Sequence, residues 1–207
     1  MKKYIVIYNK NSRGKTYSKQ DLEMIFSSHD LDSKIFVTNE IKQVDKIVKN
    51  FKNSKDYVYC AIGGDGTLNS LINALLGNNI NNPEVACIAS GSGSDFMRTF
   101  AMPVDIHQAI SRIKNNQNYS IDASFIESKT KSRYFINVLN YGFLAETVNL
   151  SEKLPNIFKR FRYPISFWLK LFTGKQSLFN LKTNKYEFNK KAFNVSTVSY
   201  THLRAHE

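Results

Sequence analysis

Short apolar runs and segments of helical period alternate through the first half of the chain. Apolar runs of strand length occur at residues 4–8, 34–38, 57–62 and 85–89, and each predicts a buried strand. Helical spacing predicts helices over residues 21–26, 41–51, 68–76 and 104–113, with another beginning near Asp95. Short strands separated by helices favour a parallel sheet that is covered on both faces. We therefore expect an α/β domain of nucleotide-binding type over residues 1–120.

The pattern changes after about Asn118. Consecutive strands are predicted over residues 119–127 and 133–139, a hairpin around Asn184 from 178–183 and 185–188, and a last strand over 192–198. Such runs are typical of antiparallel β structure. We expect an incomplete β-sandwich-like domain over residues 121–198, with its boundary near Gln117–Asp122.

A basic and aromatic insert lies among these strands, between residues 153 and 175. Phe, Trp and Leu alternate there with Lys and Arg, and Pro164 is expected at the first position of a short helix. One interpretation is an interfacial segment that places its aromatic rings among lipid headgroups and its cations on anionic lipid. The other is an ordinary helix that packs its aromatic face on the β domain. No nucleic-acid motif occurs, so we expect no nucleic-acid partner.

Charge and cysteine content narrow the classes of protein. Residues 1–122 hold 15 Lys/Arg and 12 Asp/Glu, a net charge of +3, whereas residues 123–207 hold 14 and 5, a net charge of +9. A basic half next to a near-neutral half suggests a surface that meets anions. Cys60 and Cys87 each fall in a predicted buried strand, which favours a reducing compartment over a disulfide framework. No apolar run reaches the roughly 18 residues of a membrane-spanning helix.

The strand over residues 57–62 is followed directly by Gly63-Gly64-Asp65-Gly66-Thr67 and then by a helix. Glycines allow positive φ and close approach of a ligand to the backbone, and the first N–H groups of a helix attract phosphate. An aspartate there repels phosphate unless a metal or a substrate hydroxyl lies between them. The string therefore predicts a nucleoside triphosphate, a divalent cation and an acceptor hydroxyl, against the alternative of a plain tight turn.

Small-residue loops follow two further predicted strands, at residues 9–15 and 90–94. Ligands of parallel α/β sheets bind at the carboxyl ends of the strands. We therefore expect these two loops and the glycine turn to converge on one site.

Together these motifs resemble those of the bacterial diacylglycerol-kinase-like lipid kinases, relatives of the sphingosine kinases, over about residues 3–197. The family's G-G-D-G-T-x-N-E motif matches from Gly63 to Asn69, with Ser70 in place of the glutamate. Its P-x-G-T-x-N-D-F-x-R motif matches residues 89–98, and its opening N-P-x-S-G-x-G loop matches residues 9–15 least well. NAD kinases carry the central motif too, so an NAD kinase-like phosphotransferase is the alternative.

The resemblance implies an ATP-dependent lipid kinase that uses Mg²⁺ and phosphorylates a hydroxyl of a lipid such as diacylglycerol. It implies Asp65 and Asp95 as catalytic residues, and leaves the metal ligands unknown. It implies a cytoplasmic protein bound peripherally to the anionic inner face of the membrane, and a homodimer is left open. The nucleotide site that it implies comprises Asn9, Ser12, Thr38, Gly63, Gly64, Gly66, Thr67 and Ser92.

Residues 199–207 break the strand pattern. The string resembles translated sequencing-adapter sequence, so we expect a non-native tail and a chain truncated near Thr197. His202 and His206, four residues apart, would pair on a metal if the tail were helical. The family carries a D-G-E segment whose glutamate is the expected general base, and no Asp-Gly-Glu occurs here. A catalytically inactive nucleotide- or lipid-binding fragment is therefore a further alternative.

Overall fold

The computed structural model describes residues 2–12, 14–51, 56–90, 94–115, 118–128, 131–158, 161–182 and 186–199. The chain forms two compact units, residues 1–136 and 137–207. This division follows the second of two antiparallel strands, β5 (Ser124–Glu127) and β6 (Ser132–Phe135). The sequence pattern placed a boundary near Gln117–Asp122. The tail from residue 200 onward lies outside the described residues.

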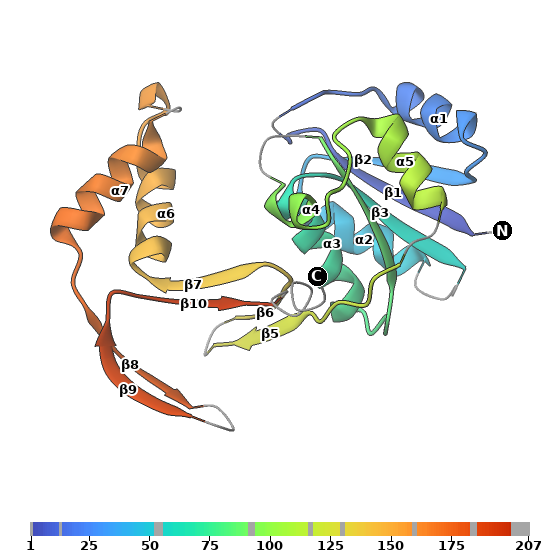
Figure 1. Cartoon of the computed structure of the whole chain (residues 1–207). Helices are drawn as coiled ribbons and strands as arrows, with labels where there is room; N and C mark the ends of the chain where they lie inside the picture. Colours follow the sequence, from blue (N-terminus) through green and yellow to red (C-terminus); the bar gives the residue numbers. More distant parts are fainter. Residues whose placement is uncertain are drawn as a thin grey trace. The chain divides into compact units, whose positions relative to one another are not determined.

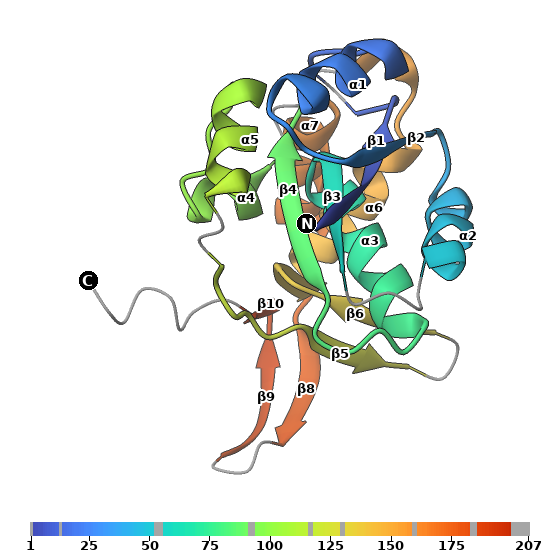
Figure 2. The same cartoon turned by 90° about the vertical axis from the view of Figure 1, so that its right-hand side faces the viewer.

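The first unit is built on a four-stranded parallel sheet in the order β2-β1-β3-β4. Helices lie on both faces of this sheet (Figures 1 and 2). The α/β class predicted from the sequence is therefore confirmed. Its elements in chain order are β1 (Lys3–Asn9), α1 (Lys19–Ser28), β2 (Ser33–Thr38), α2 (Ile41–Phe51), β3 (Tyr57–Gly63), α3 (Asp65–Gly77), β4 (Glu84–Ala89), α4 (Asp95–Thr99), α5 (Ile106–Lys114), β5 (Ser124–Glu127) and β6 (Ser132–Phe135).

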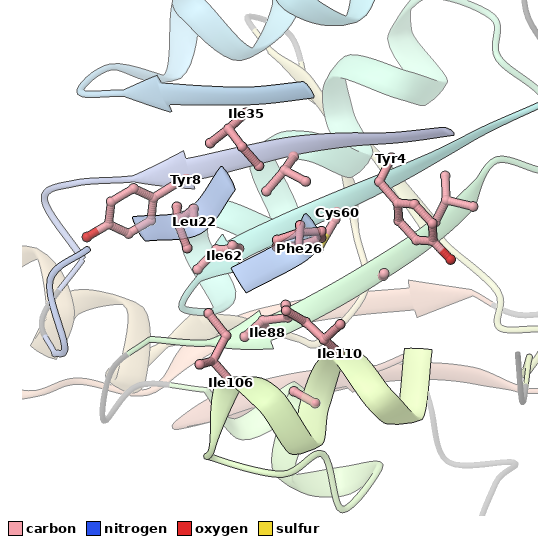
Figure 3. Packing of buried hydrophobic residues seen from close by; sticks show 14 residues of the cluster. Tyr4, Tyr8, Leu22, Phe26, Ile35, Cys60, Ile62, Ile88, Ile106 and Ile110 are labelled. Carbon is pink, nitrogen blue, oxygen red and sulfur yellow. The ribbon is translucent and has the colours of Figure 1, made fainter. Parts of the chain in front are cut away.

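Strand alternation divides the core of this unit into two layers. Tyr4, Val6 and Tyr8 of β1 point to one face, where α1 and α5 cover the sheet with Leu22, Phe26, Ile106 and Ile110 (Figure 3). Ile5 and Ile7 point to the other face, where α2 and α3 contribute Val44, Val48, Leu71 and Leu75. The central strands are therefore buried on both faces, as their continuous apolar runs predict.

A polar contact fixes the β5–β6 hairpin to helix α3. The Asn73 side chain donates to the Tyr134 carbonyl at 2.8 Å and accepts from the Tyr134 N–H at 2.9 Å. The amide thus pairs with both backbone groups of one strand residue, as a neighbouring strand would. The predicted strand over 119–127 is shorter than expected, because only its last four residues pair with β6.

The second unit contains β7 (Val138–Gly142), α6 (Phe143–Lys153), a 3₁₀ turn (Asn156–Phe158), α7 (Arg162–Thr173), β8 (Ser177–Lys182), β9 (Glu187–Ala192) and β10 (Asn194–Val198). β8 and β9 form the predicted hairpin, and β7 pairs with β10, both antiparallel. Phe143 of α6 packs against Phe167 of α7 and stacks on Phe193. These strand pairs agree with the antiparallel structure that the sequence predicts for this half.

Two expectations for the second half were wrong. The predicted strand over 133–139 is two strands, because Ile136 is buried in the core of the first unit while Val138 pairs with β10. Pro164 is the third residue of α7 and not its first. It still lies in the first turn, where the missing N–H has no intrahelical acceptor to lose. In the described part of the chain, no helix is long and apolar enough to cross a bilayer.

Candidate active site

The candidate site lies where the order of the sheet reverses. β1 pairs with β2 on one side and β3 on the other, so the chain builds outward in two directions from β1. Ligands of open α/β sheets bind at such a switch point, beyond the carboxyl ends of the strands. Asn9 ends β1, and its side-chain amide donates to the Thr67 hydroxyl at 3.2 Å. This hydrogen bond joins the loop after β1 to the turn after β3 across the switch point.

Helix α3 begins at the glycine turn. Its N-cap is Gly64, in extended conformation, which makes no side-chain cap hydrogen bond. The backbone N–H groups of Thr67 and Leu68 donate to the Gly64 carbonyl. The first N–H groups of α3 have no intrahelical partner and carry the positive end of the helix dipole. This helix start is therefore suited to an anion.

The glycines of this turn provide space because they lack a Cβ, and they are not required for a positive φ. In the described residues, positive φ occurs at Gly14 and Gly142 among the glycines, and Gly63 and Gly66 lie outside that region. A Cβ on Gly63 would lie 2.3 Å from the Thr67 hydroxyl oxygen, whereas a Cβ on Gly66 would meet no atom within 4 Å. Gly63 therefore permits packing within the turn, and Gly66 leaves open space beside the start of α3.

Asp65 connects this turn to helix α4. Its two carboxylate oxygens accept hydrogen bonds from the backbone N–H groups of Asp95, at 2.9 Å, and Phe96, at 3.1 Å. Burial raises the pKa of Asp65, and the negative charge of Asp95 acts in the same direction, while the two N–H groups and Arg98 oppose the rise. The half-buried carboxylate of the first residue of α3 thus holds the first turn of α4.

Asp95 is the first residue of α4, and Ser94 is the N-cap of this helix. The Asp95 side chain is exposed and pairs with Arg98 at 3.1 Å. The contact between Asp65 and Asp95 is therefore the hydrogen bond from the backbone N–H of Asp95 to the Asp65 carboxylate. Of the two acids, Asp65 is the one that is fixed by the fold.

The hydroxyl groups of Ser12, Ser90 and Thr38 also lie at this edge of the sheet. The Ser12 and Ser90 hydroxyls lie 2.7 Å apart, so the loop after β1 also meets the end of β4. Thr38 is buried and donates to the Tyr8 carbonyl, while its own carbonyl accepts from the Lys10 N–H. Thr38 therefore supports the loop from within the sheet. Ser92 lies outside the described residues.

Of the residues that the sequence implied, the structure brings together those that it describes: Asn9, Ser12, Thr38, Gly63, Gly64, Asp65, Gly66, Thr67 and Asp95. Ser90 joins them without having been singled out as a site residue. The sequence placed Ser90 in the small-residue loop 90–94, which it expected to reach the site, without assigning this residue a role. Among the described residues, no group of three or more His, Cys, Asp and Glu side chains is placed to hold a metal ion.

A parallel sheet with helices on both faces, a helix N-terminus at its switch point and hydroxyls from three loops define an α/β domain of the kind that binds phosphate-bearing ligands. Residues 3–126 match the model of the diacylglycerol kinase catalytic domain. The chain belongs to this family, as its motifs predicted.

Relatives with known names agree with this assignment. The chain is 29% identical over 171 residues to a diacylglycerol kinase of Staphylococcus saprophyticus, an alignment that covers 81% of this chain and 53% of the relative. It is 28% identical over 170 residues to a diacylglycerol kinase of Staphylococcus aureus, covering 81% of this chain and 51% of the relative. The chain thus spans about half the length of the curated relatives that it matches.

The fold has counterparts among solved structures. A diacylglycerol kinase structure from Bacillus anthracis superposes with a TM-score of 0.63 over 94% of this chain and 63% of that chain, at 22% sequence identity. At this identity the likeness concerns the fold, which it extends over both units of the chain.

Proposed function

We propose that this chain binds ATP with Mg²⁺ at the switch point and transfers the γ-phosphoryl group to a hydroxyl of a lipid such as diacylglycerol. The observation that carries the proposal is the meeting of three loops at the carboxyl edge of the sheet, joined by the Asn9–Thr67 and Ser12–Ser90 contacts. Family membership supports a lipid kinase. ATP, Mg²⁺ and diacylglycerol are the finer parts of the proposal.

The donor set of the site fits a nucleotide triphosphate. The start of α3 offers backbone N–H groups, and the open space at Gly66 lets phosphate oxygens approach them. Asn9, Ser12, Thr67 and Ser90 add uncharged donors. Asp65 supplies a negative charge at the same place, which a bound cation would offset. When bound, Mg²⁺ would neutralise charge that develops on the phosphates.

Asp65 is proposed to act on the acceptor side of the transfer. Its raised pKa, caused first by burial, favours proton exchange with a hydroxyl compared with an exposed aspartate. Its bonds to the Asp95 and Phe96 N–H groups hold the carboxylate in one orientation. Asp95, exposed at the start of α4, is proposed to orient the acceptor hydroxyl. Phosphoryl transfer depends mainly on such positioning and on charge neutralisation.

We also propose that helix α7 meets the lipid surface. Phe167 packs inward on Phe143, but the neighbouring Trp168 and Phe172 are 58% and 82% exposed, and their rings stack on one another. These exposed rings favour the interfacial interpretation of the insert over the core-helix interpretation. Lys170 pairs with Glu146 at 2.8 Å. Lys159 and Arg160, which belong to the same basic insert, lie outside the described residues.

Nucleotide binding is tested by thermal denaturation of the whole chain with and without ATP and Mg²⁺. The chain should be stabilised by ATP with Mg²⁺, and Thr67→Val should reduce that shift because it removes the hydroxyl but keeps the shape of the side chain. Thr173→Val is the matched control, since Thr173 bonds the Leu169 carbonyl in α7, in the second unit. An equal shift in both variants would remove Thr67 from the proposed site, and no shift in the wild type would remove ATP.

A further inference from the structure

Two histidines outside the candidate active site contact each other, one at the end of α1 and the other at the start of α5. His29 caps the end of α1, and His107 lies in the first turn of α5. Nε2 of His29 lies 3.1 Å from Nδ1 of His107, and the ring centroids are 5.4 Å apart. α1 and α5 cover the same face of the sheet (Figure 1). The contact therefore joins two elements that are far apart in the sequence.

We propose that His29 and His107 form a binding site for a divalent transition-metal cation such as Zn²⁺. Two nitrogen ligands of one tetrahedral zinc, each at about 2.0–2.1 Å from the metal, lie about 3.3 Å apart. The observed separation of 3.1 Å already matches this value closely. A small rotation of the rings would turn both lone pairs toward one ion, with water in the remaining positions.

The metal would replace the hydrogen bond between the two imidazole rings. In the metal-free pair one ring donates its N–H to the lone pair of the other. On binding, the proton of the donor ring moves from its facing nitrogen to its other nitrogen, so both facing nitrogens offer a lone pair and no net proton is released. Imidazole suits zinc, copper and nickel, whereas magnesium prefers oxygen ligands and water. The site would therefore select against the Mg²⁺ that the proposed kinase activity requires.

The charges around the pair offset one another in part. His107 borders a shallow hollow that is also lined by Gln108, Ser111, Arg112 and Asn115. Lys114 of α5 donates to the His29 carbonyl and pairs with Asp30 at 3.2 Å, so these two charges offset each other. Arg112 is the nearby cation that opposes binding, and its guanidinium donates to the Ala101 carbonyl. A bound ion would link the end of α1 to the start of α5 and stabilise the first unit.

The test is thermal denaturation and calorimetric titration of the whole chain with ZnCl₂. At ten times the dissociation constant, zinc should raise the melting temperature by about 3–6 °C with one ion bound per chain. MgCl₂ at the same concentration should give no comparable shift through this pair. His29→Gln and His107→Gln should each abolish the zinc shift.

The control is the chain's other two histidines, His202 and His206. A His202→Gln, His206→Gln double variant should retain the zinc shift in full. The proposal is overturned if the shift survives in His29→Gln and His107→Gln, if it is lost in the double variant, or if the wild type shows no shift. The measurement needs neither ATP nor lipid, so its outcome is independent of the proposed kinase function.

Discussion

Two glycines of the turn, three residues apart, should respond to the same substitution in opposite ways. Gly63→Ala places a Cβ 2.3 Å from the Thr67 hydroxyl oxygen and 2.7 Å from the Thr67 Cβ. Overpacking of this kind costs about 1–3 kcal/mol, and Thr67 is β-branched in the first turn of a helix, so its side chain has few other rotamers. At roughly 2–4 °C per kcal/mol for a chain of this length, the melting temperature should fall by about 2–12 °C.

Gly66→Ala should instead stabilise the fold and weaken the binding of the nucleotide. Its Cβ meets no atom within 4 Å, and replacing glycine by alanine in a helix gains about 0.5–1 kcal/mol. The same methyl group would occupy the space through which phosphate reaches the first N–H groups of α3. Loss of one hydrogen bond to a charged group, about 1.5–3 kcal/mol, should weaken ATP binding about tenfold or more.

Gly77→Ala is the matched control for this pair. Gly77 ends the same helix, and a Cβ there also meets no atom within 4 Å. It should give a similar gain in melting temperature without any change in the affinity for ATP with Mg²⁺, measured by calorimetry. The reasoning is refuted if Gly66→Ala binds ATP as well as Gly77→Ala does, or if Gly63→Ala is as stable as the wild type.

Three further predictions follow from the same contacts. Burial raises the folded-state pKa of Asp65 above its ordinary value of 3.8, so the protonated form stabilises the fold and this contribution is lost as the pH rises through the folded-state pKa. The melting temperature of Asp65→Asn, compared with that of the wild type, should therefore increase from acid to neutral pH. A decrease of this difference over the same pH range would contradict the prediction. Asn73→Ala should destabilise the chain by about 1–3 kcal/mol and remove hydrogen-exchange protection from the Tyr134 amide, whereas unchanged protection would show that the β5–β6 hairpin does not depend on Asn73. Trp168 is the chain's single tryptophan, so the fluorescence of the protein should shift to the blue on anionic vesicles but not on neutral ones. Replacing Lys159 and Arg160 with Ser should weaken this shift. Fluorescence that is unaffected by vesicles would favour the core-helix interpretation of α7.

The first unit could be predicted closely because its signals are local. The run from Tyr57 to Ile62 is apolar at every position that enters the two-sided core, and the strand ends at Gly63, the first glycine after this run. The helix over 41–51 has the predicted bounds. The second half was less predictable, because the apolar pattern runs on across Ile136 and Asn137, where the structure changes from one unit to the other.

Helix α6 had no comparable signal. It buries only Phe143 and Thr147, so it lacks a clear apolar stripe. It begins at Gly142, whose φ of 88° and close approach to the Phe193 carbonyl are properties of the folded chain. The start of this helix is therefore determined by a contact between residues about fifty positions apart in the sequence. The local sequence pattern around Gly142 gives no information about this contact.

For the candidate site, too, the features within one short segment could be predicted from the sequence, and the contacts between distant residues could not. The glycine turn and its acid were visible in one five-residue string. The pairing of Ser12 with Ser90, 78 residues apart, was not. Nor was the role of Asp65 in holding the N–H groups of Asp95 and Phe96, about thirty residues further on. Sequence motifs thus indicated which residues lie at the candidate site, while the fold determined how they contact one another.

The central proposal is phosphoryl transfer to a lipid, and a transfer assay tests it most directly. The whole chain is incubated with ATP carrying a radiolabelled γ-phosphate, Mg²⁺ and anionic vesicles that contain diacylglycerol, and label in the extracted lipid is counted. The account predicts label in the lipid with the wild type and none with Asp65→Asn, although that variant still binds ATP. A wild type that binds ATP without labelling lipid, or an Asp65→Asn variant that labels it equally well, would contradict the account.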